Sequence, residues 1–185
     1  MRKIILLLSM ALLILVSGCN KAKDSKSIYG YVQGDKYINK ELGFSMDVPQ
    51  GWIVNENFEN LGEGTVEELG TKTVGGMVNM SMEEALSDTG EKEDISSIYI
   101  TLIGEYSSME DYATEQYTDL NFKDMSNKKI NGKDYIVIRY ENSDRQEKCD
   151  RYVTMCDDKV LVFSVISSDD TIEEVDKSIE SIKFK

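Results

Sequence analysis

Adjacent acidic residues have the type and spacing that acid–base chemistry requires. Such pairs occur at Glu67-Glu68, Asp157-Asp158, Asp169-Asp170 and Glu173-Glu174. Two such carboxylates can act as the general acid and base of a hydrolase. Structural roles explain them more simply: Asp157-Asp158 suits a hairpin turn, Asp169-Asp170 a helix cap, and Glu173-Glu174 a first helical turn, where the helix dipole favours negative charge. A hydrolase is therefore the function that we expect least.

Histidine is absent from the chain, and this excludes several catalytic arrangements. There can be no serine–histidine or cysteine–histidine nucleophile pair and no histidine-ligated metal site. Ser126 and Lys129 match the Ser-x-x-Lys spacing, but the companion Ser-Asp-Asn and Lys-Thr-Gly sequences are missing, and we expect both residues in a loop. We expect no enzyme, no catalytic residue and no cofactor.

Two segments are candidates for ligand binding. The loop from Glu83 to Asp94 carries six carboxylates that could bind calcium, but it lacks the spacing and turn glycine of an EF-hand, so we favour a solvated loop and assign no metal ligand. Ten tyrosines suggest a stacking surface for sugars or peptides, although strands also favour tyrosine. Tyr29, Tyr31 and Tyr37 are the candidates that could stand clear of the core.

The N-terminus has the order of a secretory signal peptide. Met1-Arg2-Lys3 precedes an apolar run from Ile4 to Val16, and Ser17-Gly18 supplies small residues before Cys19. A membrane-spanning helix is the alternative, but Ile4 to Gly18 is 15 residues, short of the roughly 20 that a span needs. We therefore predict that the segment is removed on export.

The four residues Val16-Ser17-Gly18-Cys19 resemble the lipobox of bacterial lipoproteins. The resemblance implies that Cys19 becomes the lipidated first residue of the mature protein and holds it on the extracytoplasmic face of the cell membrane. Residues 1–18 are then the signal peptide, the polar residues 19–27 a flexible tether, and residues 28–185 one domain.

The mature chain is strongly acidic. Without Arg2 and Lys3, 19 basic residues remain against 34 acidic ones, a formal charge of −15. Such a chain repels phosphates, so we expect no nucleic-acid partner. An anionic membrane surface repels it as well, which leaves the anchoring to the lipid on Cys19. We expect the other partner to be an unidentified protein.

Cys149 and Cys156 lie in a segment that reads as one continuous strand from Lys148 to Cys156. Seven steps of about 3.3 Å would separate their alpha carbons by roughly 23 Å, far beyond the limit of about 7 Å for a disulfide. Their odd separation also directs them to opposite faces. We predict two unpaired thiols with a packing role.

Turn residues and periodicity predict the elements. Gly34-Asp35 suits a hairpin, residues 44–48 alternate as a strand, and Pro49-Gln50-Gly51 should bring Trp52 into the core. We allow a short helix near Thr65 and prefer a strand over residues 77–82, paired with residues 98–106, to a helix capped by Ser81.

The second half of the chain is easier to interpret. Helical spacing predicts a helix over residues 109–120, capped by Ser108 and Asp111. Asn131-Gly132 predicts a hairpin, and strands over 135–140, 148–156 and 160–167 should form a meander. A closing helix capped near Asp170 completes an α+β domain with a largely antiparallel sheet and helices packed on it. The apolar run Val160 to Phe163 predicts a strand buried on both faces.

The stretch from Gly43 to Trp52 resembles the opening of PsbP-like domains, and the closing residues 178–184 agree with that group. The resemblance implies an antiparallel sheet between helices, an α/β/α sandwich. The stretch from Tyr29 to Asn39 is also similar to small lipoproteins of low-GC Gram-positive bacteria. Neither resemblance supplies a catalytic residue. The expectation is a non-enzymatic protein-interaction or envelope-assembly module, with a small-molecule, glycan or calcium-binding lipoprotein as the alternative.

Overall fold

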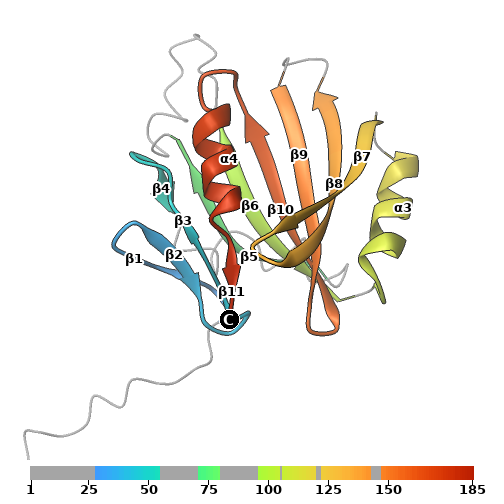
Figure 1. Ribbon diagram of the computed structural model, residues 1–185, viewed down its shortest axis with the longest axis horizontal. Helices are drawn as coiled ribbons and strands as arrows, with labels where there is room; N and C mark the ends of the chain where they lie inside the picture. Colours follow the sequence, from blue (N-terminus) through green and yellow to red (C-terminus); the bar gives the residue numbers. More distant parts are fainter. Residues whose placement is uncertain (1–27, 55–70, 80–95, 105, 120–121, 143–146) are drawn as a thin grey trace, which may run out of the picture.

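Two antiparallel sheets and two helices form the part of the chain that the structure describes (Figure 1). The structure is a computed structural model that describes residues 28–54, 71–79, 96–104, 106–119, 122–142 and 147–185. The smaller sheet has the order β1-β2-β3-β11. Its strands are β1 (Tyr31–Gln33), β2 (Lys36–Asn39), β3 (Phe44–Asp47) and β11 (Lys183–Phe184). The predicted α+β class with largely antiparallel strands is confirmed.

The larger sheet has seven strands in the order β4-β5-β6-β10-β9-β8-β7. Short turns at Asn131-Gly132 and Asp157-Asp158 connect β7 to β8 and β9 to β10, as the sequence predicts. Asn131 and Asp157 adopt the left-handed φ values of 47° and 54° that these tight turns require. The strands are β4 (Ile53–Val54), β5 (Thr71–Val78), β6 (Ser97–Ile103), β7 (Phe122–Ile130), β8 (Lys133–Asn142), β9 (Glu147–Cys156) and β10 (Lys159–Ser167).

Both faces of the seven-stranded sheet are covered, because successive residues of its central strands alternate between two clusters. Leu161 and Phe163 of β10 belong to one cluster, which includes the four-stranded sheet and helix α4 (Ile172–Glu180). Val160 and Val162 belong to the other, with Tyr112 and Ala113 of helix α3 (Met109–Asp119). All four β10 residues are at most 2% exposed, which confirms the prediction of a strand buried on both faces.

The cysteine prediction is confirmed for the described residues. β9 runs without a bulge against β10 from Lys148 to Cys156. Cys149 and Cys156 are buried and form no disulfide within the described part of the chain. Cys156 belongs to the cluster that contains Phe163, whereas its neighbour Met155 packs on the opposite cluster.

Several element boundaries differ from those that the sequence predicts. Ser126 to Lys129 lie in β7, not in a loop, because this edge strand is set by pairing with β8 rather than by its own hydrophobic pattern. β5 begins at Thr71 rather than Met77. The short strand β11 follows α4 and pairs with β3. The expected helix near Thr65 lies outside the described residues.

The predicted N-terminal cap is present at one helix and absent at the other. At α3, the backbone N–H of Asp111 donates a 3.0 Å hydrogen bond to Ser108 Oγ, as the capping prediction requires. At α4, Thr171 rather than Asp170 precedes the helix, and its side chain makes no cap hydrogen bond. The Thr171 hydroxyl instead bonds to Ser96 Oγ at 2.6 Å, a long-range contact that the local sequence did not indicate.

Candidate functional site

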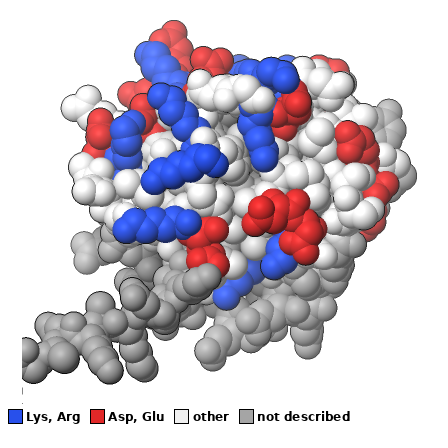
Figure 2. Space-filling view, turned by 60° about the horizontal axis from the view of Figure 1, so that its bottom comes forward, with Lys and Arg blue, Asp and Glu red and all other residues white. Residues whose placement is uncertain are grey.

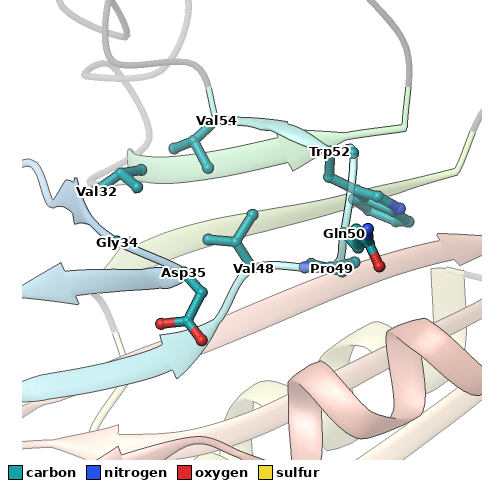
Figure 3. A pocket seen from close by; sticks show the side chains of 9 residues that line it. Val32, Gly34, Asp35, Val48, Pro49, Gln50, Trp52 and Val54 are labelled. Carbon is teal, nitrogen blue, oxygen red and sulfur yellow. The ribbon is translucent and has the colours of Figure 1, made fainter.

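A pocket of about 310 Å³ opens between an edge strand of each sheet (Figure 3). Its walls come from the β1–β2 hairpin, the turn after β3, and β4. Figure 3 shows Val32, Val48 and Val54 pointing toward the same space, whereas the carboxylate of Asp35 points away from them. The lining residues are Val32, Gly34, Asp35, Val48, Pro49, Gln50, Gly51, Trp52 and Val54.

The turn after β3 shapes this pocket. Gly51 has a φ of 82°, a conformation that favours glycine, and the Trp52 N–H donates a 3.2 Å hydrogen bond to the Pro49 carbonyl oxygen. The Val48 N–H donates a 2.8 Å bond to the carbonyl oxygen of Asp35, which holds the β1–β2 turn beside the end of β3. Trp52 then enters the core with 9% of its surface exposed, as the sequence predicts.

Five of the nine lining residues have apolar side chains, and polar atoms supply slightly more than half of the exposed lining. The few ionisable groups limit the chemistry that the pocket can support. Asp35 is the only ionisable side chain among the lining residues, and Gln50 adds an exposed amide. An acid–base hydrolase would need a second carboxylate close to the first. The arrangement suits a ligand that presents an apolar group to the valines and polar atoms to the rest of the lining.

The structure separates the three tyrosines of the predicted ligand surface. The prediction is wrong for Tyr37, which is 1% exposed and packs with its ring centroid 6.0 Å from that of Phe44. Residues in β2 alternate between faces, and Tyr37 faces the seven-stranded sheet. Burial raises the pKa of Tyr37 to about 12. It therefore supports the core and cannot form part of a ligand surface.

Tyr29 and Tyr31 are half-buried and lie outside the lining of the pocket. Each ring carries a lysine ammonium group above it. The ammonium of Lys72 is 5.1 Å from the ring centroid of Tyr29, and that of Lys40 is 4.9 Å from the ring centroid of Tyr31. One face of each ring is therefore in contact with a lysine and is not open for a sugar or peptide to stack on it.

A polar cluster that the sequence did not indicate joins α3 to the sheet. Arg151 in β9 donates hydrogen bonds to Gln116 Oε1 and, at 3.4 Å, to the Tyr112 hydroxyl. Its guanidinium lies 5.4 Å from the ring centroid of Tyr140. The Nε atom of Arg151 is buried without a hydrogen-bond partner in the described structure. We assign these residues a role in holding α3 on the sheet.

The other candidate residues do not converge. Asp157-Asp158 forms a turn, Asp169 pairs with Lys148, and Glu173-Glu174 lies in the first turn of α4. Among the described residues, no group of three side chains could hold a metal ion, and no helix is long and apolar enough to cross a membrane. Cys19, Glu67-Glu68 and the loop from Glu83 to Asp94 lie outside the described residues.

No family model and no curated protein matches the chain. Solved structures do show similarity. The solution structure of the cyanobacterial PsbP (CyanoP) of Synechocystis has 14% sequence identity and a TM-score of 0.49, and the match covers 91% of this chain and 98% of that one. A crystal structure from Bacteroides thetaiotaomicron has 15% identity and a TM-score of 0.49, over 83% of this chain and 49% of that one. LpqN of Mycobacterium tuberculosis, involved in cell envelope biogenesis, has 12% identity and a TM-score of 0.43, over 77% and 83% of the two chains.

Proposed function

We propose that the protein is a lipid-anchored, non-enzymatic binding module on the extracytoplasmic face of the cell membrane. The pocket between the two sheets then holds an apolar segment of a partner protein. The observation that carries this proposal is the composition of the pocket: three valines, Pro49 and Trp52 surround a space with one ionisable side chain in its lining. The anchor rests on the lipobox-like residues before Cys19.

The partner is tested by photocrosslinking in living cells. A photoreactive amino acid at Gln50, an exposed residue of the lining, should give a defined adduct with one protein. Val32→Glu places a charge in the pocket and should abolish the adduct. Gln33→Glu is the matched control, because Gln33 is exposed and points to the other side of β1, and it should leave the adduct unchanged. Equal adducts in both variants would contradict the proposal.

The anchor has a separate test. Cys19→Ala should abolish lipidation and leave the signal segment uncleaved, as mass spectrometry of the protein would show. Processing to the same mature mass as the wild type would contradict the anchor but would leave the pocket test unaffected.

A small apolar molecule is the second candidate ligand. The pocket volume of about 310 Å³ is at the lower end of the range for small-molecule sites, which starts near roughly 300 Å³. Trp52, the only tryptophan of the chain, lines the pocket and reports its occupancy. A small-molecule ligand should change the tryptophan emission in the Gln33→Glu variant and not in the Val32→Glu variant.

A further inference from the structure

Eleven lysines have side chains that the structure describes, and they divide into two groups. Five of them pair with carboxylates: Lys36 with Asp47, Lys128 with Glu180, Lys129 with Asp134, Lys148 with Asp169 and Lys177 with Glu173. The other six have no carboxylate within 4.0 Å in the part of the chain that the structure describes. We name these six the lysine end: Lys40, Lys72, Lys133, Lys159, Lys183 and Lys185.

Strand registers place this group at one end of the molecule. Lys159 begins β10, where it pairs with Cys156 at the end of β9. The next residue, Val160, pairs with Ile103 at the end of β6. Ile103 also pairs with Thr71, so Lys72 in β5 lies at the same end of the seven-stranded sheet. Lys133 begins β8 at the same end. Its ammonium lies 4.6 Å from the ring centroid of Phe184 in β11.

The smaller sheet contributes the remaining lysines to the same end. The Lys185 N–H donates a 2.9 Å hydrogen bond to the carbonyl oxygen of Gly43, in the β2–β3 turn that also contains Lys40. Cys156 Sγ contacts the Leu42 carbonyl oxygen at 3.5 Å, which joins this turn to the end of β9.

Basic side chains therefore gather although the whole chain is acidic. Figure 2, which brings the bottom of Figure 1 forward, shows lysine and arginine side chains grouped on one part of this face. Acidic residues occur at the same end, namely Glu41 beside Lys40, Asp134 beside Lys133 and Asp157-Asp158 beside Lys159. Four of the six lysines are exposed: Lys40, Lys159, Lys183 and Lys185.

The chain also enters the described domain at this end. The Asn39 side-chain amide donates a 2.8 Å hydrogen bond to the carbonyl oxygen of Ile28, next to the turn that carries Lys40. The eight residues that precede Ile28 contain Lys21, Lys23 and Lys26 against one acidic residue, Asp24. A lipid on Cys19 would consequently be joined to the domain at the lysine end.

We propose that the lysine end docks on anionic phospholipid headgroups. This inference rests on the proposed lipid anchor and concerns how the anchored domain is oriented. Charges farther than about 8–10 Å from the bilayer are screened at physiological ionic strength, so the local lysines outweigh the distant acidic residues. A lysine near an anionic surface contributes about fivefold in binding.

The orientation has a consequence for the pocket. β2 runs from the Gly34-Asp35 turn, which lines the pocket, to the turn that carries Lys40. The two sites thus lie at opposite ends of the same strand. A domain that rests on its lysine end presents the pocket away from the membrane, where a protein partner can reach it.

Lysine acetylation in vesicles tests the docking. The full lipidated protein is reconstituted into phosphatidylcholine vesicles, with or without phosphatidylglycerol, and each lysine's labelling is measured by mass spectrometry. Phosphatidylglycerol should lower labelling of the lysine end by about fivefold, and high salt should restore it. Lys36 in β2 and Lys148 in β9 lie at the ends of their strands that are farther from the lysine end, so their labelling should not change. Equal labelling in the two kinds of vesicle, or equal protection of Lys36 and Lys148, would overturn the proposal.

A charge-matched pair of variants separates docking from net charge. The first variant changes Lys40, Lys133 and Lys159 to Gln, and the control changes Lys36, Lys148 and Lys177 to Gln. Lys72 and Lys183 report protection in both, and thermal unfolding checks that both fold. Phosphatidylglycerol should no longer protect Lys72 and Lys183 from acetylation in the first variant, and it should still protect them in the control. Loss of protection in both variants would show that net charge, not the lysine end, binds the membrane.

The anchor and the docking fail in different ways. Protein that does not float with pure phosphatidylcholine vesicles lacks the anchor. The same protein added to phosphatidylglycerol vesicles still shows whether the lysine end binds them.

Discussion

The hydroxyl group of Tyr37 donates a 2.8 Å hydrogen bond to the carbonyl oxygen of Val74 and thereby joins the two sheets. The same hydroxyl accepts a 3.1 Å bond from the Gly30 N–H. Glycine is required on both sides of the ring, because a Cβ at Gly30 would lie 2.2 Å from Tyr37 Cζ and one at Gly75 would lie 2.1 Å from the hydroxyl. The tyrosine that the sequence suggested for ligand binding is thus part of the joint between the sheets.

Tyr37→Phe should destabilise the protein by about 1–3 kcal/mol, because it removes a buried hydrogen bond and leaves the Val74 carbonyl without it. Urea unfolding measures the loss. Tyr99→Phe is the matched control, since Tyr99 is 40% exposed and should change stability by less than about 0.5 kcal/mol. Equal effects of the two substitutions would contradict the structural role of Tyr37.

Stability should fall at alkaline pH. Burial raises the pKa of Tyr37 to about 12 and also raises the pKa values of Tyr135 and Tyr152. A tyrosine whose pKa is higher in the folded state stabilises the folded protein as long as its phenol is protonated. This contribution to the free energy of unfolding is complete below the unfolded tyrosine pKa of about 10, and it is lost as the pH rises through the folded-state pKa.

The loss should reach about 1.4 kcal/mol per pH unit for each such tyrosine between pH 10 and 12. Urea unfolding at several pH values measures it, with tyrosine absorbance as a second signal. Tyr37→Phe should have a smaller slope than the wild type, and an unchanged slope would argue against the burial of this phenol.

Local patterns predicted the elements whose partners are close in sequence. Gly34-Asp35, Asn131-Gly132 and Asp157-Asp158 form the turns expected, and α3 begins at the cap of Ser108. β7 was missed because Asp124 to Asn127 are exposed on both faces, so no apolar alternation marks an edge strand that is held by its partner β8.

Long-range packing explains the other differences. Tyr37 is buried because β2 packs against β5, and only the structure brings Val74 to its hydroxyl. The pocket combines residues of two strands and two turns, and the lysine end combines residues from Lys40 to Lys185, so neither has a continuous sequence signal. The Gly75-Gly76 pair carries no strand pattern in the sequence, although Gly75 in β5 lies against the Tyr37 hydroxyl.

The Asn131 side chain should stabilise the C-terminal end of α4. Its amide donates 2.8 Å hydrogen bonds to the carbonyl oxygens of Glu180 and Ile182, which lie at and just after the last turn of the helix. Asn131→Gly keeps the turn conformation and should cost about 1–2 kcal/mol, whereas Asn131→Asp cannot donate and should cost more. Thermal unfolding distinguishes the two, and an Asp variant as stable as the wild type would exclude this role.

Thiol counting tests both the burial of the two cysteines and the modification of Cys19. Cys149 and Cys156 are 2% and 7% exposed, and burial raises the pKa of the Cys156 thiol, with the nearby Asp157 adding to the shift. Both thiols should therefore resist Ellman's reagent in the native protein at neutral pH, because the thiolate is the reactive form. After denaturation two thiols should react in the membrane-derived protein, since lipidation blocks Cys19. Cys149→Ala should reduce that number to one.

Two results would contradict these expectations. A third reactive thiol in the wild-type protein would show that Cys19 carries no lipid. Rapid reaction before denaturation would show that the two cysteines are not buried.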